Sequence, residues 1–119
     1  MNTLNQIFGT PSQDTLLGTS ANDQMYGYQG DDQLLGSVGD DILFGGMGDD
    51  SLFGGQNDDI LFGDKGNDQL FGDLGNDVLD GGEGADTLFG GDGNDAFIVS
   101  AGDLVLDYNP MEDVLIFQL

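Results

Sequence analysis

The sequence predicts an all-β protein, a right-handed parallel β-roll built from stacked coils. Three observations predict this fold. From residue 9 to residue 98 the chain divides into ten rows of nine residues, with no insertion or deletion. The first position of every row is Gly, the sixth is Asp and the eighth is apolar. Positions 7 to 9 suit a short strand whose middle side chain points inward, because side chains alternate along a strand.

Each row predicts one turn followed by one strand. Positions 1, 2 and 4 are rich in Gly, which is expected where a tight turn requires positive φ. Asn57 at position 4, and Asp64 and Asp73 at position 2, tolerate the same conformation. Two rows then close one coil of 18 residues. Alternate rows therefore stack into two parallel sheets, one of odd rows and one of even rows.

The two ends of the chain depart from the repeat. After the tenth row the pattern lapses, but Asp103 and Asp113 each precede an apolar segment, as the sixth position of a row does. The steps from Asp95 to Asp103 and then to Asp113 together span one coil, so a sixth, irregular coil is expected. The predicted organisation is a lead-in over 1–8, ten repeats over 9–98 and a capping segment over 99–119.

The composition excludes several classes of function. The 119 residues include one Lys or Arg, 23 Asp or Glu, no His and no Cys, for a formal charge of −22. Zinc-finger sites, haem ligation by His, Cys nucleophiles, Ser-His-Asp triads and disulfides are therefore excluded. The charge opposes binding to nucleic acid and to anionic membrane surfaces. No apolar run is long enough to span a bilayer, and the N-terminal segment lacks the features of a Sec-type signal peptide.

Rows such as GGMGDDSLF and GGQNDDILF carry a recognisable motif. They resemble the nonapeptide G-G-x-G-x-D-x-U-x, with U apolar, of the RTX (repeats-in-toxin) calcium-binding proteins. The resemblance covers about three quarters of the chain. It implies a calcium-binding roll that is exported unfolded by a non-Sec, type I route and folds outside the cell, where calcium is abundant.

The spacing of the coils suits a calcium ion. Stacked strands lie about 4.8 Å apart, and Ca–O bonds are about 2.3–2.6 Å long, so an ion midway between two turns can bond an oxygen of each. The position-6 carboxylates then form two columns with four gaps each, and about six to eight Ca²⁺ ions are expected. The odd column holds Asp14, Asp32, Asp50, Asp68 and Asp86, and the even column holds Asp23, Asp41, Asp59, Asp77 and Asp95.

The resemblance implies further ligands on the backbone. In RTX rolls the carbonyls of positions 2 and 4 in one turn, and of positions 1 and 3 in the next turn of the column, complete the shell around each ion. Rows one and two depart from the motif at position 4, with Ser12 and Ala21, so their sites are expected to be weak. Asp103 and Asp113 are candidate ligands in the cap. The carbonyl candidates are Tyr28, Gly30, Gly39, Gly45, Gly46, Gly48, Gly54, Gly63, Lys65, Gly66, Gly72, Gly75, Gly81 and Gly90.

Other interpretations of the same residues fit less well. A disordered acidic tail would not place Asp every nine residues beside an inward Leu. No window matches the EF-hand loop, and the Asp-Asp pairs occupy turn positions 5 and 6 rather than an acid–base site. We therefore expect a calcium-binding structural module that folds on binding Ca²⁺, and no enzyme activity. A rigid adhesin or assembly module, and a repeat appendage of a secreted enzyme or toxin, stay open as alternatives.

The outer faces of the two sheets are expected to differ. Even rows carry apolar residues on the outward side as well as the inward side, whereas position 7 of the odd rows is always polar. An exposed apolar patch of this kind is typical of an interface. We expect a second copy of the chain or a partner domain to cover the patch, which consists of Ile42, Phe44, Ile60, Phe62 and Val78.

Overall fold

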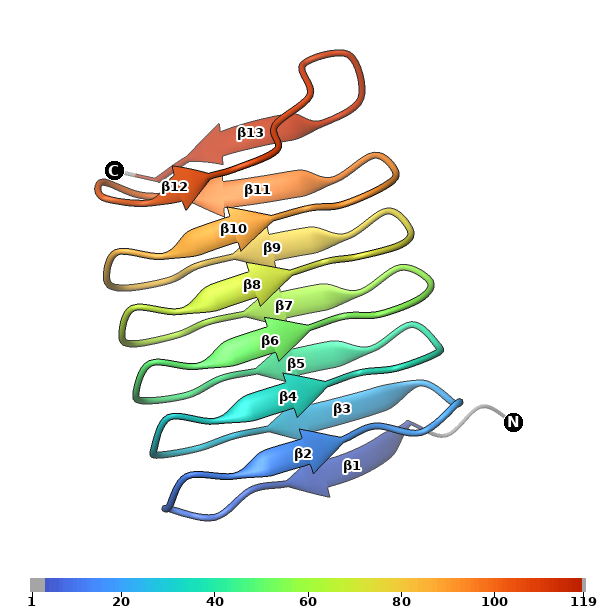
Figure 1. The fold of residues 1–119 in the computed structure, drawn as a ribbon, viewed down its shortest axis with the longest axis vertical. Helices are drawn as coiled ribbons and strands as arrows, with labels where there is room; N and C mark the ends of the chain where they lie inside the picture. The colour runs from blue at the N-terminus through green and yellow to red at the C-terminus, as the bar shows by residue number, and fades with distance from the viewer. Residues whose placement is uncertain (1–3, 119) are drawn as a thin grey trace.

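A computed structural model describes residues 4–118, and these residues form short parallel strands joined by turns (Figure 1). The strands make two sheets of seven and six strands. Within residues 4–118 no helix is long and apolar enough to cross a membrane. The larger sheet contains, in spatial order, β1 (Asn5–Phe8), β3 (Asp23–Tyr26), β5 (Ile42–Phe44), β7 (Ile60–Phe62), β9 (Val78–Asp80), β11 (Ala96–Val99) and β13 (Val114–Phe117). The smaller sheet contains β12 (Leu104–Val105), β10 (Thr87–Phe89), β8 (Gln69–Phe71), β6 (Ser51–Phe53), β4 (Gln33–Leu35) and β2 (Thr15–Leu17).

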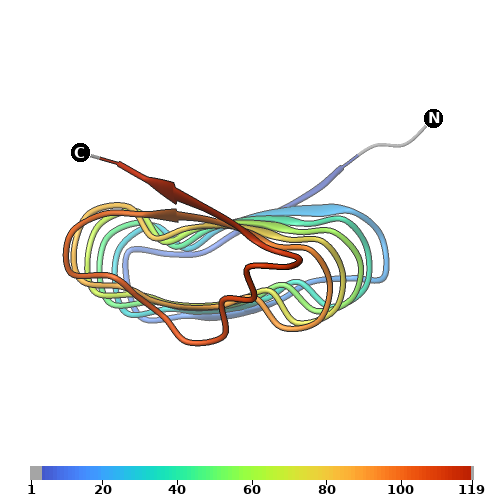
Figure 2. The same ribbon diagram turned by 90° about the horizontal axis from the view of Figure 1, so that it is seen from above.

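The fold is the predicted parallel β-roll. Positions 7 to 9 of every row form a strand, and each strand pairs with the strand two rows away. In the even-row sheet, Leu61 of β7 lies opposite Leu43 of β5 and Leu79 of β9. Each pair of rows therefore makes one flattened coil, and Figure 2 shows the coils superimposed when the roll is viewed from above.

The core is a layer of position-8 side chains between the two sheets. From row two onward these side chains are fully buried, as the alternation along each strand predicts, whereas Leu16 of row one is half-buried. Burial of such side chains is the main apolar contribution to the stability of each coil. The layer consists of Met25, Leu34, Leu43, Leu52, Leu61, Leu70, Leu79, Leu88 and Phe97, with Val99 beside it.

The turns confirm part of the expectation about Gly. In rows three to ten, positions 2 and 4 have positive φ, including Asp64, Asp73 and Asn57. Position 1 was also expected to need positive φ, and this is wrong. Gly is needed there because of space: a Cβ atom on Gly45 would lie 2.6 Å from Asp50 Oδ2 and 2.8 Å from the carbonyl oxygen of Gly63.

Both ends of the roll continue the two sheets. At the N-terminal end β1 pairs with β3 and places Ile7 opposite Met25, whereas residues 1–3 of the expected lead-in lie outside the described residues. At the C-terminal end β12 pairs with β10, and β13 pairs with β11. Val114 lies opposite Ala96, one full coil away. The last coil is irregular but keeps the stacking direction of the repeats.

The apolar outer face of the even-row sheet is less exposed than expected. Tyr26, Phe44 and Phe62 stack in a ladder, with ring centroids 5.1 Å and 5.0 Å apart and ring planes about 6° from parallel. Because neighbouring coils cover one another in this way, all five side chains of the expected patch are half-buried. This burial weakens the argument for a second copy on this face, and the structure gives the expected homodimer no support.

Candidate metal centre

The position-6 carboxylates line up along the two turn edges of the roll. From Asp23 onward those of the repeats are buried, with at most 2% of each residue exposed. From Asp32 onward each one accepts a hydrogen bond from the preceding coil of its column: Asp68 Oδ1 accepts the Asp50 backbone N–H at 2.8 Å, and Asp86 Oδ1 accepts that of Asp68 at 2.7 Å. This ladder fixes Oδ1 of each carboxylate from Asp32 onward, and the position of Oδ2 follows from it.

The second carboxylate oxygen, Oδ2, has no partner in eight of these residues. A buried acceptor without a hydrogen bond is rare and costly, and a buried charged one is more so. Unpartnered atoms repeated at the same position of successive coils therefore form a candidate cation site rather than a local irregularity. The eight residues are Asp32, Asp41, Asp50, Asp59, Asp68, Asp77, Asp86 and Asp95.

A backbone carbonyl converges on the unpartnered oxygen in six of these eight turns. At Gly63, the point where a Cβ would stand is 2.6 Å from Asp68 Oδ2 and 2.6 Å from the carbonyl oxygen of Gly81 in the next coil. The same pair of oxygens surrounds position 1 throughout rows three to eight. In rows nine and ten the atoms nearest to this point are instead side-chain atoms of Asp86, and of Asp95 and Phe97. Hard oxygen donors in a buried acidic site suit Ca²⁺.

The other predicted carbonyl ligands lie in the same turns. The carbonyl of Tyr28, one of these ligands, accepts the Met47 N–H of the next coil at 2.8 Å. The carbonyl of Glu83, which was not among the candidates, accepts the Gly66 N–H at 3.1 Å. A carbonyl oxygen has a second lone pair, so these bonds leave it able to accept again. Within residues 4–118 no three acidic side chains gather around one point, so a cation here would draw on backbone oxygens. The carbonyl set stays a prediction.

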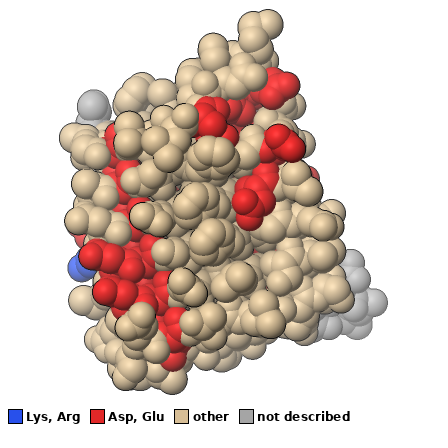
Figure 3. Space-filling model, viewed as in Figure 1, with Lys and Arg blue, Asp and Glu red and all other residues tan. Residues whose placement is uncertain are grey.

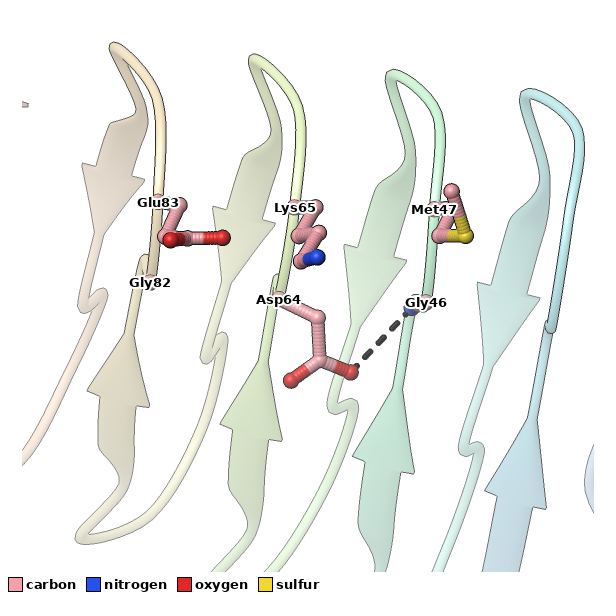
Figure 4. A pocket seen from close by; sticks show the side chains of 6 residues that line it. All are labelled: Gly46, Met47, Asp64, Lys65, Gly82 and Glu83. Atoms are coloured by element: carbon pink, nitrogen blue, oxygen red, sulfur yellow. Dashed lines mark hydrogen bonds between the residues drawn. The ribbon is translucent and has the colours of Figure 1, made fainter.

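The side chains at position 3 line a shallow hollow on the outside of the odd-row turns. Figure 4 shows Met47, Lys65 and Glu83 on three successive coils, and the backbone of Lys65 pairs with both neighbours. Asp64 lies beside them, and its Oδ2 accepts the Gly46 N–H at 3.2 Å. The expected role of the Lys65 carbonyl as a ligand stays a prediction.

Burial sets the electrostatics of the columns. It raises the pKa of Asp59, Asp68 and Asp77 to about 8, and like charges in the same column add to the rise. The pKa values of Asp50 and Asp86 rise to about 7 for the same reason. Burial thus destabilises the charged form of each carboxylate, and a bound cation would offset this cost.

These shifts predict how pH acts on the metal-free chain. A pKa raised in the folded state means that the folded chain holds protons, so its stability is greatest below the ordinary Asp value of about 4 and is lost as the pH rises through about 6–8. We expect the metal-free chain to show more β circular dichroism at about pH 5 than at about pH 8. An equal signal at both pH values would contradict this.

The terminal Asp residues of each column lie in line with the others but differ from them. Asp103 Oδ1 accepts the Asp86 N–H, and Asp113 Oδ1 accepts the Asp95 N–H, each at 2.9 Å. Asp14 and Asp23 lie at the opposite ends of the columns. In all four residues Oδ2 accepts a backbone N–H from within the same turn. None of the four therefore has the free oxygen that marks the interior turns.

Sequence reasoning missed a second ladder at position 5. Asp49 Oδ1 accepts the Asn67 N–H of the next coil at 2.8 Å, and Asp31 Oδ1 accepts the Asp49 N–H at 2.8 Å. This ladder runs forward along the chain, whereas the position-6 ladder runs back. Its signal was present, because position 5 is Asp or Asn in eight of the ten rows. Figure 3 shows acidic side chains gathered in a band along one side of the roll, with separate patches toward its opposite upper side.

Comparison with known proteins agrees with this site. The chain matches the RTX calcium-binding nonapeptide repeat four times, over residues 8–43, 35–70, 44–79 and 71–103. No curated protein matches it. The repeat matches cover most of the 119 residues and include every turn with an unpartnered carboxylate oxygen. The chain therefore belongs to the RTX calcium-binding nonapeptide repeat family.

Proposed function

We propose that the chain is a calcium-binding structural module whose folding is coupled to calcium. The observation that carries this proposal is the set of eight buried carboxylate oxygens without partners. Such a column of like charges is unstable without counter-charge, since carboxylates about 4.8 Å apart repel by roughly 1–3.5 kcal/mol per neighbouring pair. Family membership supports calcium as the cation, and RTX repeats form a structural rather than a catalytic family.

The turns of rows three to ten would hold the ions. A bound Ca²⁺ would supply positive charge and accept oxygen ligands from two stacked turns. The protein contributes the position-6 carboxylate, fixed through Oδ1, and the position-1 carbonyl of the next coil. Six turns combine both features, which supports six ions as the number bound. The carbonyls of positions 2, 3 and 4 would complete each shell.

A methyl group at position 1 tests the site directly. In Gly45→Ala the new Cβ would lie 2.6 Å from Asp50 Oδ2 and 2.8 Å from the Gly63 oxygen, where the oxygens converge. We expect this variant to bind at least one Ca²⁺ fewer than the wild type in equilibrium dialysis. Gln69→Ala, on the exposed outer face of β8, is the control and should bind the wild-type number. An unchanged number in Gly45→Ala would place the ions elsewhere.

We infer from the family that the protein acts outside the cell. RTX repeats are typical of secreted proteins. Because calcium is scarce inside the cell, the chain would stay unfolded until export. Millimolar calcium outside the cell would then fold it. A type I export route agrees with this order of events. The roles of an adhesin or of an enzyme's appendage would both use the same calcium-loaded roll as a rigid support.

A further inference from the structure

The turns at the ends of the two columns satisfy their carboxylates from within. In row one, the Thr10 N–H donates to Asp14 Oδ2 at 2.6 Å, and the Thr10 hydroxyl donates to Oδ1 at 2.9 Å. In row two, Thr19 makes the same two bonds to Asp23, at 2.7 Å and 2.9 Å. The residue at position 2 thus occupies both carboxylate oxygens, which in the interior turns it does not contact.

The backbone of these two turns differs from that of the interior turns. The Thr10 hydroxyl also accepts the Ser12 N–H at 3.2 Å, and the Thr19 hydroxyl accepts the Ala21 N–H at 3.1 Å. Positions 2 and 4 lack the positive φ that they have in rows three to ten. A β-branched residue strongly disfavours positive φ, so Thr at position 2 holds the turn in its alternative conformation.

The C-terminal end repeats the arrangement with other residues. The Asn109 N–H donates to Asp113 Oδ2 at 2.8 Å, and Asn109 Oδ1 accepts the Met111 N–H at 3.0 Å. In the last odd turn, the Ser100 N–H donates to Asp103 Oδ2 at 2.8 Å. Each column therefore begins and ends with a carboxylate whose Oδ2 is already bonded.

We propose that these four self-capped turns close both columns to calcium and so set the number of ions that the roll binds. This inference rests on the proposed function. At the N-terminal end the cap is the deciding feature, because the converging oxygens are present there: a Cβ on Gly9 would lie 2.7 Å from both Asp14 Oδ2 and the Gly27 oxygen. Row one lacks a free carboxylate oxygen, and its turn lacks the positive φ at positions 2 and 4 that interior turns have.

The test is to open a closed turn. The double variant Thr19→Gly with Ala21→Gly gives row two the sequence GGSGND, with Gly at positions 1, 2 and 4 as in interior rows. We expect native mass spectrometry in calcium to show one more bound ion than in the wild type, seven in place of six. Ala21→Gly alone keeps the Thr19 cap and is the control, which should stay at the wild-type number.

A second variant keeps the test independent of the folding of row two. Thr10→Gly with Ser12→Gly opens the odd column instead and should also add one ion. An unchanged number in both double variants, or a wild type that binds eight or more ions, would overturn the role of the caps. A wild type that binds no calcium would overturn the proposed function itself, so the two failures are distinguishable.

Discussion

Removing calcium is expected to unfold most of the chain. At about pH 7.5 with chelator the circular dichroism should be that of a largely disordered chain, and millimolar Ca²⁺ should restore the β signal. With Kd near 10⁻⁴ M and calcium near 10⁻³ M, each site contributes about 1.4 kcal/mol. Six such sites contribute about 8 kcal/mol, which is comparable to the stability of a small domain.

Magnesium is the matched control for this experiment. Mg²⁺ prefers shorter bonds of about 2.0–2.1 Å and loses its water reluctantly, so it should replace calcium poorly in a shell spread over two coils. The same titration with Mg²⁺ would distinguish folding caused by specific calcium binding from folding caused by general screening of the −22 charge. A full β signal in chelator at neutral pH would contradict the coupling of folding to calcium.

Asp68→Asn is expected to have the largest effect of any single side-chain change. Asn keeps an oxygen for the Asp50 N–H, so the hydrogen-bond ladder stays possible, but it removes the charge from the middle of the odd column. The Asp68 carboxylate lies between two proposed calcium sites, one on each side in the column. Losing both sites would lower the folding stability by about 3 kcal/mol at millimolar calcium. We expect the calcium concentration at half-folding to rise several-fold, measured by circular dichroism during the titration.

Asp49→Asn is the matched comparison. It makes the same chemical change one position earlier in a neighbouring turn, on an exposed side chain whose Oδ1 accepts the Asn67 N–H. Because Asn can accept that bond equally well, the calcium midpoint should move little. Asp59→Ala in the even column should behave like the odd-column variant. Equal midpoints for the Asp49 and Asp68 variants would remove the distinction between positions 5 and 6.

The strands and the core could be predicted because they depend on a period. Leu43, Leu61 and Leu79 recur at intervals of 18 residues, and that interval is the register of the sheet. The pattern also marked the position-6 Asp residues, since every row carries one. Position 1 was misjudged because Gly is used there to leave space and not to permit positive φ, and composition alone does not separate these two uses.

The caps could not be predicted from the repeat because they lie where it weakens. From the sequence, only Ser12 and Ala21 were identified as departures in rows one and two. The role of Thr10 and Thr19 depends on a hydroxyl that reaches the carboxylate four residues later in a changed turn. Likewise, the stacked rings of Phe44 and Phe62 partly bury each other on the outer face of the sheet. This burial depends on how neighbouring coils approach each other. Periodicity describes each row, whereas these contacts join one row to another.

The two ladders at positions 5 and 6 point in opposite directions along the chain, so each interior coil holds both of its neighbours. An insertion or deletion should therefore be tolerated best when it adds or removes whole coils. Excision of residues 45–62 would join row four to row seven and leave every later residue on its original sheet. Excision of one row would instead carry Phe62 and all that follows to the opposite sheet. This architecture can thus be lengthened or shortened by two repeats at a time, although its sequence repeats every nine residues.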